Sequence, residues 1–491
     1  MNRAERLARL LRVLAAIIAE PGLNPLELAD RAGVSERTLR RDLAELRDLG
    51  YDVAYTSGYE VQEKLNLEGR GKAQPRRRGD DALLQAVAQA VESAGLWRET
   101  ERVAAPAPRR GKPPRKAGPA PLVLIPSGSE DADFLYATGF EVESGLYIRF
   151  AAGDDVLLVS PLEIDRARVQ AHVKTIVEDR EAYAHKAWAK AALPLLQARG
   201  IEEIRVSPNL RAIHLEELVA LGLDVTIDHE LFVAERRHKS KEEAKAIREA
   251  QEAAESAVVE VVRELAKADV REGMLWTDGE PLTSERLYAT AQLSLGRLGF
   301  TCPNMIIAGS PDNALPHYRG EGQIKANAPV IIDVFPTSRR THYNGDLTRT
   351  VVVGEISEEF RRMHAAVLQA LDAGIETISA GVRGKDPHVA VCEVLVDRGY
   401  STTSKGFEGP DGVARMNHST GHGVGLEVHE EPALRETTEY PLEEGDVVTV
   451  EPGLYRLGLG GVRIEDTGMV TGHGFENFTT LTRSLDPRDY L

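Results

Sequence analysis

Four carboxylates in the last third of the sequence lie in segments that are otherwise apolar and rich in β-branched residues. The segment IIDVFPTSRRTHYNGDLTRTVVV holds Asp333 and Asp346, while VVTVEPGLY and GGVRIEDTGMV hold Glu451 and Glu465. Each acid alone is weak evidence, because a single carboxylate in a strand is often a satisfied turn or edge residue. Together they require compensation, because ionised carboxylates are costly in strands that are packed on both faces.

A glycine-rich segment, HSTGHGVGLEVHEEP, adds His418, His422 and His429. A lone histidine is more often structural than a ligand, but here an imidazole accompanies four carboxylates. Two divalent cations and a hydroxide would neutralise most of the acidic charge. Oxygen donors with one imidazole suit manganese, magnesium or cobalt better than a metal that prefers thiolates. The residues therefore predict a two-metal site.

The elements that must position this site are the acid-bearing strands, a long helix and a preceding α/β region. The helix is expected to begin at Ser240, which forms a capping box with Glu243. Its predicted apolar face comprises Ile247, Ala250, Ala254, Val258, Val261 and Leu265. Before the helix, strand-like runs such as LVLIPS and DVLLVS alternate with helix-like segments over about 120–235, which indicates an α/β domain.

Residues 236–491 resemble the creatinase/aminopeptidase P/prolidase family of metallopeptidases, and residues 119–235 resemble, more loosely, the amino-terminal domain of that family. The resemblance implies an α+β fold class with a pita-bread catalytic domain. It also implies two divalent metal ions, with manganese expected first and cobalt or zinc as alternatives, and a homodimer. The ligand order of the family, Asp, Asp, His, Glu, Glu, matches five residues of this sequence: Asp333, Asp346, His422, Glu451 and Glu465.

The resemblance further assigns roles to these five ligands. Asp333 would hold one metal, His422 and Glu451 would hold the other, and Asp346 and Glu465 would bridge the two. A metal-bridging hydroxide would then attack the amino-terminal peptide bond of a peptide substrate. Glu451 is expected to take and return the proton.

Four further residues match positions around the active site of the family. His317, in the segment NALPHYRG, and His429 would donate hydrogen bonds to the tetrahedral intermediate. His418 and Arg463 would position the substrate and the ligands. For these last two residues, local structural hydrogen bonding is the alternative.

The expected activity is that of an Xaa-Pro aminopeptidase. Hydrolysis of Xaa-Pro dipeptides, as in prolidases, is the nearest alternative. A different class is a DNA-binding regulator whose peptidase-like region binds an effector without cutting it. One departure bears on substrate preference: the spacing of Asp333 and Asp346 is longer than in typical aminopeptidase P sequences, and the extra residues fall in PTSRRTHY.

The first 65 residues have the pattern of a small winged helix-turn-helix, with helices followed by a hairpin over about 53–61. The segment LNPLELADRAGVSERTLRRDLAELRDLGYDV resembles the DNA-binding domains of bacterial regulators of the deoxyribose-repressor type. A helix beginning at Ser35 would enter the major groove of DNA. The alternative is an interaction module whose arginines are merely solvated. The residues expected to face bases and phosphates are Ser35, Arg37, Thr38, Arg40 and Arg41.

Between these regions, residues 66–118 are predicted to be a basic, proline-rich linker with one amphipathic helix. The chain has 491 residues and a net charge of −17, and no apolar run long enough to span a membrane. Its first 20 residues are interpreted as a helix of a folded domain rather than a signal peptide, which predicts a cytoplasmic protein. Cys302 and Cys392 fit a reducing compartment.

Overall fold

The computed structural model describes residues 120–491 throughout and a small part of the chain before them. The chain divides into two compact units, Met1–Arg115 and Lys116–Leu491. The predicted linker over 66–118 lies outside the described residues. In the first unit the described residues are two short strands together with Val13, Leu28, Ala29, Val34, Thr38, Leu39 and Leu43.

The two strands of the first unit confirm the predicted hairpin. Strand β1 (Val53–Tyr55) pairs antiparallel with β2 (Tyr59–Val61). Leu39 and Leu43 are helical and buried. Thr38 is helical and half-buried. The other predicted DNA contacts lie outside the described residues: Ser35, Arg37, Arg40 and Arg41.

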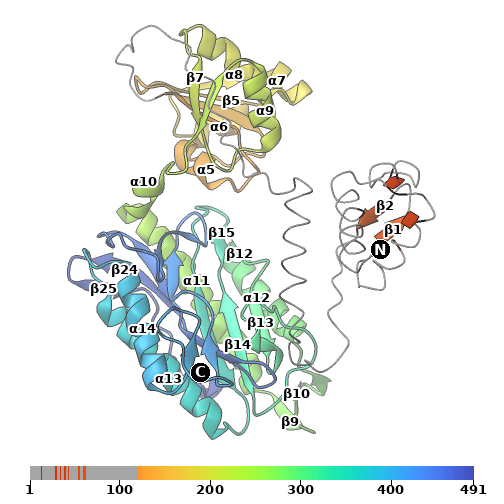
Figure 1. The fold of residues 1–491 in the computed structure, drawn as a ribbon, viewed down its shortest axis with the longest axis vertical. Coiled ribbons are helices and arrows are strands. Elements are labelled where there is room, and N and C mark those ends of the chain that lie inside the picture. Colours follow the sequence, from red (N-terminus) through yellow and green to blue (C-terminus); the bar gives the residue numbers. More distant parts are fainter. Residues whose placement is uncertain are drawn as a thin grey trace. The chain divides into compact units, whose positions relative to one another are not determined.

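The second unit opens with a mixed sheet, part of which is labelled in Figure 1. It has six strands in the order β6-β5-β4-β3-β7-β8. The pairs β3–β4 and β4–β5 are antiparallel, and the remaining pairs are parallel. This alternation of strands and helices confirms the α/β character predicted for the region. The strands are β3 (Leu122–Leu124), β4 (Gly145–Arg149), β5 (Asp155–Val159), β6 (Thr175–Glu178), β7 (Glu203–Val206) and β8 (Asp224–Ile227).

Five helices cover the two faces of this sheet. Helices α5 (Ala132–Thr138) and α6 (Ile164–Gln170) pack on one face, where Phe134 and Ala167 join Tyr147 in an apolar cluster. The other face is covered by α7 (Arg180–His185), α8 (Trp188–Gln197) and α9 (Ala212–Ala220).

The long helix α11 (Lys241–Ala266) follows the short helix α10 (Val233–Arg237). The capping box between Ser240 and Glu243 is present, as predicted. The six residues expected on the apolar face are all buried, so the predicted face is confirmed. Helix α11 packs with α12 (Ser284–Leu298) against a sheet of three strands, β13-β14-β16. These strands are β13 (Ile306–Gly309), β14 (Pro329–Val334) and β16 (Leu347–Val352).

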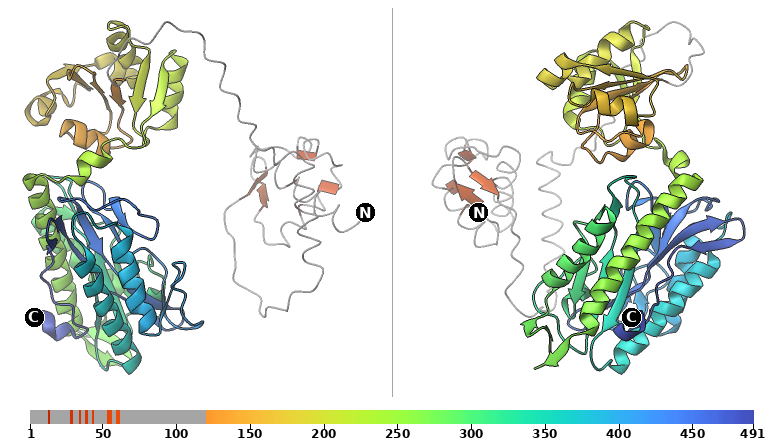
Figure 2. Two further views of the ribbon diagram at one scale, coloured as in Figure 1. Left: turned by 60° about the vertical axis from the view of Figure 1, so that its left-hand side comes forward. Right: turned by 180° about the vertical axis from the view of Figure 1, so that it is seen from behind.

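A second pair of helices, α13 (Glu358–Thr377) and α14 (Lys385–Asp397), packs against two further sheets. In Figure 2, α11 (green) and α13 and α14 (cyan to light blue) lie along the surface of this region. One sheet has the order β20-β19-β21-β24-β25 and the other β17-β18-β22-β23. Their strands are β17 (Ser401–Thr402), β18 (Arg415–Met416), β19 (Gly421–Gly423), β20 (Glu430–Leu434), β21 (Val447–Val450), β22 (Gly453–Arg456), β23 (Gly460–Arg463), β24 (Asp466–Thr471) and β25 (Gly474–Asn477).

The segment between β14 and β16 contains the residues PTSRRTHY. It includes β15 (Thr337–Ser338), which pairs with β12 (Phe300–Thr301). A small sheet lies after α11 and is formed by β9 (Asp269–Arg271), β10 (Met274–Thr277) and β11 (Glu280–Pro281). Within the described part of the chain, no helix combines the length and the apolar character needed to cross a membrane.

Candidate metal centre and active site

All nine residues that the sequence predicted for the metal site and its surroundings line one cavity of about 910 Å³. The cavity lies in the region formed by the strands between β13 and β24. The nine residues come from segments that are far apart in the sequence: Asp333, Asp346, His422, Glu451, Glu465, His317, His418, His429 and Arg463.

The predicted carboxylates lie in or at the ends of strands. Asp333 is within β14, Asp346 directly precedes β16, and Glu451 directly follows β21. Glu465 was expected within a strand, but it lies between β23 and β24, where its backbone N–H donates to the carbonyl of Thr348. From this position the side chain of Glu465 lines the cavity.

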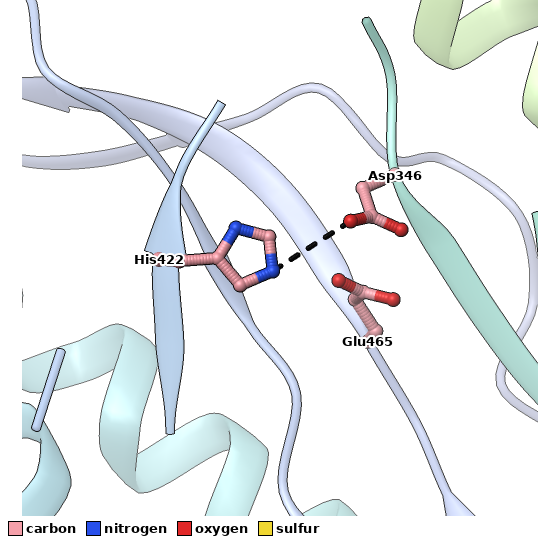
Figure 3. Close-up of side chains that lie close together, drawn as sticks. All are labelled: Asp346, His422 and Glu465. Carbon is pink, nitrogen blue, oxygen red and sulfur yellow. Dashed lines mark ion pairs between the residues drawn. The ribbon is translucent and has the colours of Figure 1, made fainter. Parts of the chain in front are cut away.

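Asp346, His422 and Glu465 form the tightest group. One ligand atom from each lies within 4.8 Å of the others, and Figure 3 shows the three side chains converging. The Nε2 atom of His422 is 3.7 Å from Oδ2 of Asp346. The Oε2 atom of Glu465 accepts a hydrogen bond from the hydroxyl of Thr348 at 2.8 Å, but its Oε1 atom is buried without a hydrogen-bond partner.

Glu451 adjoins this group through His422. Its Oε1 atom is 3.3 Å from Nε2 of His422. Burial alone would raise the pKa of Glu451, but the hydrogen bond and charge of His422 outweigh burial and lower that pKa to about 2. Burial alone would lower the pKa of His422, but Glu451 and Asp346 raise it to about 9. These two residues therefore form an ion pair in the metal-free protein.

The carboxylates of Asp346 and Glu465 are poorly compensated. Burial, followed by the charge of Asp333, raises the pKa of Asp346 well above its usual range. Burial and the charge of Asp346 raise the pKa of Glu465 in the same way. Like charges that are buried close together disfavour ionisation, and a cation between them reverses that effect.

Asp333 lies apart from the tight group and pairs with Arg463. The Nη2 atom of Arg463 is 2.5 Å from Oδ2 of Asp333. Arg463 also donates to the hydroxyl of Tyr455 at 2.8 Å. The guanidinium of Arg463 therefore already has two hydrogen-bond partners in the protein, one of which is a predicted metal ligand.

These observations together test whether a divalent cation fits the site. The donors are carboxylates and one imidazole, a set that suits hard divalent ions. The orphaned Oε1 atom of Glu465 and the raised carboxylate pKa values of Asp346 and Glu465 indicate uncompensated negative charge. The residues present therefore fit a metal.

Two residues that support the site were missed in the sequence. Gln251, on α11, donates through Nε2 to the carbonyl of Asp346 at 2.8 Å, and its Oε1 atom accepts the N–H of Asp346 at 2.9 Å. Gln251 lies four positions after Ile247, on the predicted apolar face of the helix. A polar residue at such a position could have indicated a buried hydrogen bond. Gly345 permits this approach, because a Cβ atom there would lie 2.7 Å from the backbone of α11.

Tyr455 is the second missed residue. Its hydroxyl lies 3.0 Å from Nε2 of His418 and accepts from Arg463, so it links the two residues. The Nδ1 atom of His418 lies 2.8 Å from the carbonyl of Ser419. Burial lowers the pKa of His418, which favours the neutral imidazole that donates from Nδ1 and accepts at Nε2. Tyr455 lies in the segment VVTVEPGLY, four positions after Glu451, so the sequence did offer a signal.

The two other histidines face the same cavity. The rings of His429 and His422 meet edge to face with their centroids 4.3 Å apart. Burial and the neighbouring His422 lower the pKa of His429. His317 is exposed on the cavity wall.

Comparison with known proteins gives matches to both parts of the chain. Residues 245–472 match metallopeptidase family M24, and residues 9–60 match an HTH domain. The HTH match does not specify the deoxyribose-repressor type, which stays a prediction.

Relatives and solved structures extend the likeness beyond the family match. The chain is 28% identical over 369 residues to the Xaa-Pro dipeptidase of Pyrococcus horikoshii, covering 73% of this chain and 93% of the relative. It is 34% identical over 250 residues to the Xaa-Pro dipeptidase of Pyrococcus furiosus, covering 50% and 64%. The solved structure of the prolidase from Pyrococcus furiosus superposes with a TM-score of 0.61 at 26% identity, covering 74% of this chain and 97% of that chain. Residues 245–472 thus resemble metallopeptidase family M24, and the protein is a hydrolase of the metallopeptidase type.

Proposed function

We propose that the protein uses two divalent metal ions to hydrolyse the peptide bond that precedes proline. The observation that carries the proposal is the convergence of Asp346, His422 and Glu465, with Oε1 of Glu465 buried and without a partner. A buried carboxylate oxygen is costly unless a donor or a cation meets it. The proposed ligands are these three residues together with Asp333 and Glu451, with manganese as the first candidate and cobalt or zinc as alternatives.

The ions would supply Lewis acidity and a water acidic enough to act as a nucleophile near neutral pH. The chain's own residues then manage protons and position. Glu451 takes a proton from the attacking water and returns it to the leaving nitrogen, a role supported by its place beside His422. His429 and His317, which line the same cavity, donate hydrogen bonds to the developing oxyanion.

His418 and Arg463 help to hold the proposed metal ligands in position. Arg463 holds Asp333, and Tyr455 connects Arg463 to His418. We propose that both residues position the ligands and the bound peptide through this chain of hydrogen bonds.

The names of the relatives favour Xaa-Pro dipeptides as substrates over the longer peptides that an aminopeptidase cleaves. Dipeptide hydrolysis was the alternative to the activity expected from the sequence. The test is an assay of purified, manganese-loaded protein on Xaa-Pro dipeptides and on longer peptides with proline in second position. Release of free proline from the dipeptides supports the proposal. Absence of turnover on both classes, with the metal bound, contradicts it.

A second proposal concerns the HTH domain at residues 9–60. We propose that it binds DNA, with Ser35, Arg37, Thr38, Arg40 and Arg41 as contacts, a proposal supported by the β1–β2 hairpin. Fluorescence anisotropy with duplex DNA across a salt series tests it. Binding that weakens with salt and on replacing Arg37, Arg40 and Arg41 by alanine is expected. Unchanged binding favours a protein-interaction module instead.

The Glu451→Gln variant helps to distinguish a peptidase from a DNA-binding regulator that catalyses no reaction. In a peptidase this substitution abolishes hydrolysis by the purified protein. If the wild-type protein never hydrolyses a peptide but binds DNA, the regulator is the better account.

A further inference from the structure

The short helix α10 is anchored in both of the regions that it joins. Just before it, Leu231 and Phe232 are buried in the apolar core of the six-stranded sheet. Near its end, Arg237 donates to both carboxylate oxygens of Asp446, at 2.9 and 2.7 Å. Helix α10, which Figure 1 labels between the two regions, is therefore held by contacts at both of its ends.

Arg236, on α10, is the centre of a buried cluster of charges. Its Nη2 atom lies 2.7 Å from Glu427 and 2.6 Å from Glu430, and its Nη1 atom lies 3.5 Å from Asp133 on α5. The ammonium of Lys239 lies 2.5 Å from the other oxygen of Glu430. The side chains of Arg236, Glu430 and Lys239 are only 10%, 6% and 1% exposed. Asp133 is held in turn by the hydroxyl of Ser207 at 2.6 Å.

The two glutamates of this cluster belong to the wall of the metal cavity. Both line it, together with Arg236 itself. Glu430 directly follows His429 in the sequence. In the pairing of β19 with β20 it lies opposite Gly423, the residue after His422. Its carboxylate is seated against Gly425, where a Cβ atom would lie 2.3 Å from Oε1 of Glu430.

We propose that Arg236 is a positioning residue that holds the segment 427–430, and with it His429, in place beside His422. Through Asp133, the same guanidinium makes the six-stranded sheet part of the support of the active site. The proposal rests on the proposed function in one respect, because it takes His429 to contact the substrate.

The charge balance of the cluster explains why this support matters. With Arg236 replaced by methionine, Glu430 keeps the ammonium of Lys239 and Asp133 keeps the hydroxyl of Ser207, but each loses the guanidinium, as does Glu427. A buried carboxylate that loses part of its compensating charge is destabilised, so the segment moves until the acids are closer to water. Glu427, whose side chain is 44% exposed, can do so freely, but Glu430 can do so only if β20 shifts. A displacement of about 1 Å at a group that contacts the substrate lowers the rate by about 100-fold.

The experiment compares three variants with a matched control in the manganese-loaded, full-length protein. Arg236→Met removes the positive charge. Arg236→Lys keeps the charge but offers one ammonium in place of the guanidinium. Glu427→Gln weakens the contact of Arg236 with Glu427, a residue of the cavity wall. The control is Arg205→Met, which breaks the ion pair of Arg205 with Asp228 in the six-stranded sheet region. The readouts are kcat and KM on an Xaa-Pro dipeptide, bound metal, and hydrogen exchange of the backbone over 425–431.

Arg236→Met is expected to lower kcat by about 10- to 100-fold with bound metal unchanged. Exchange over 425–431 is expected to accelerate, with partial recovery of kcat and of protection in Arg236→Lys. Arg205→Met is expected to change neither readout. A lower melting temperature with normal kcat and normal exchange over 425–431 would mean that Arg236 only stabilises the fold, and would overturn the proposal.

Two outcomes separate this proposal from the proposed function. If the wild-type protein does not turn over any peptide, the proposed function fails, while the exchange over 425–431 still decides whether Arg236 holds this segment. If Arg236→Met does not fold, Glu427→Gln decides. Faster exchange at the segment supports the proposal, and unchanged exchange overturns it.

Discussion

The side chain of Gln251 forms hydrogen bonds with both the backbone N–H and the backbone carbonyl of Asp346, 95 residues further along the chain. It thereby fixes the start of β16 against α11 and sets the direction in which the Asp346 carboxylate leaves the backbone. A third contact, to the hydroxyl of Thr479 at 3.0 Å, locks the amide itself. Gln251 is completely buried.

Replacing Gln251 by leucine is therefore expected to affect both folding and metal binding. It leaves the buried backbone N–H of Asp346 without a partner, whereas the carbonyl keeps the hydroxyl of Thr467 as a donor, and it lowers the free energy of unfolding by about 1–3 kcal/mol. Because the support of a ligand is lost, manganese affinity is expected to fall by about 10- to 100-fold. Denaturant unfolding and titration calorimetry measure the two effects. Gln323→Leu, which loses a hydrogen bond to Leu275 instead, is the control and should keep its metal affinity.

Glu465→Gln is expected to stabilise the metal-free protein while removing the stabilisation by metal. The pKa of Glu465 is raised in the folded protein, so the wild-type stability is highest below the usual carboxyl range and is lost as pH rises through the raised value. The neutral amide does not incur this loss at pH 7. Saturating metal at 100 times the dissociation constant stabilises the wild-type protein by about 2.7 kcal/mol.

Thermal unfolding at pH 7, with chelator and with manganese, measures both halves of this prediction. The wild-type melting temperature should rise on adding metal, and that of the variant should not. Equal stabilisation of both proteins by manganese would show that Glu465 is not a ligand.

Metal binding is expected to release protons at neutral pH. In the metal-free protein the pKa of His422 is about 9, because Glu451 and Asp346 stabilise the imidazolium. A metal requires the neutral imidazole, so the proton must leave. The apparent affinity should rise about tenfold per pH unit for each proton released, and flatten as pH approaches 9.

Calorimetric titration in buffers of different ionisation enthalpy counts these protons directly. At least one proton per protein is expected at pH 7. An affinity that is independent of pH between 6 and 8 would contradict the ion pair of His422 with Glu451.

Tyr455→Phe is expected to slow catalysis with little effect on folding. The ring remains, but the hydroxyl that joins Arg463 to His418 is lost. The free energy of unfolding should fall by no more than about 1–3 kcal/mol. The expected fall in kcat is about 10-fold, because Arg463 and Asp333 lose one restraint. A variant with wild-type kcat would show that the hydroxyl does not support the active site.

The residue types of the site could be predicted because their sequence context is unusual. Asp333 interrupts an apolar run, Asp346 directly precedes a segment rich in β-branched residues, and the three histidines share a glycine-rich segment. The apolar face of α11 was also predictable, because its period is set by the helix itself. The hairpin of β1 and β2 followed in the same way from local alternation.

What the sequence could not give are contacts that depend on tertiary structure. Nothing near Arg236 in the sequence indicates that it meets Glu430, 194 residues away. The pairing of Asp333 with Arg463, rather than with the group around His422, depends in the same way on how β14 and β23 pack. Glu465 was misplaced within a strand because an apolar, β-branched context does not reveal where a ladder ends.

The central claim is that acidic residues far apart in the sequence hold two divalent cations in one cavity. Anomalous diffraction from crystals grown with manganese tests it most directly. The account predicts two manganese peaks about 2.0–2.3 Å from carboxylate oxygens of Asp346 and Glu465, one of them also bonded to His422. Crystals that diffract well and contain manganese, but show no peak between these side chains, would contradict it.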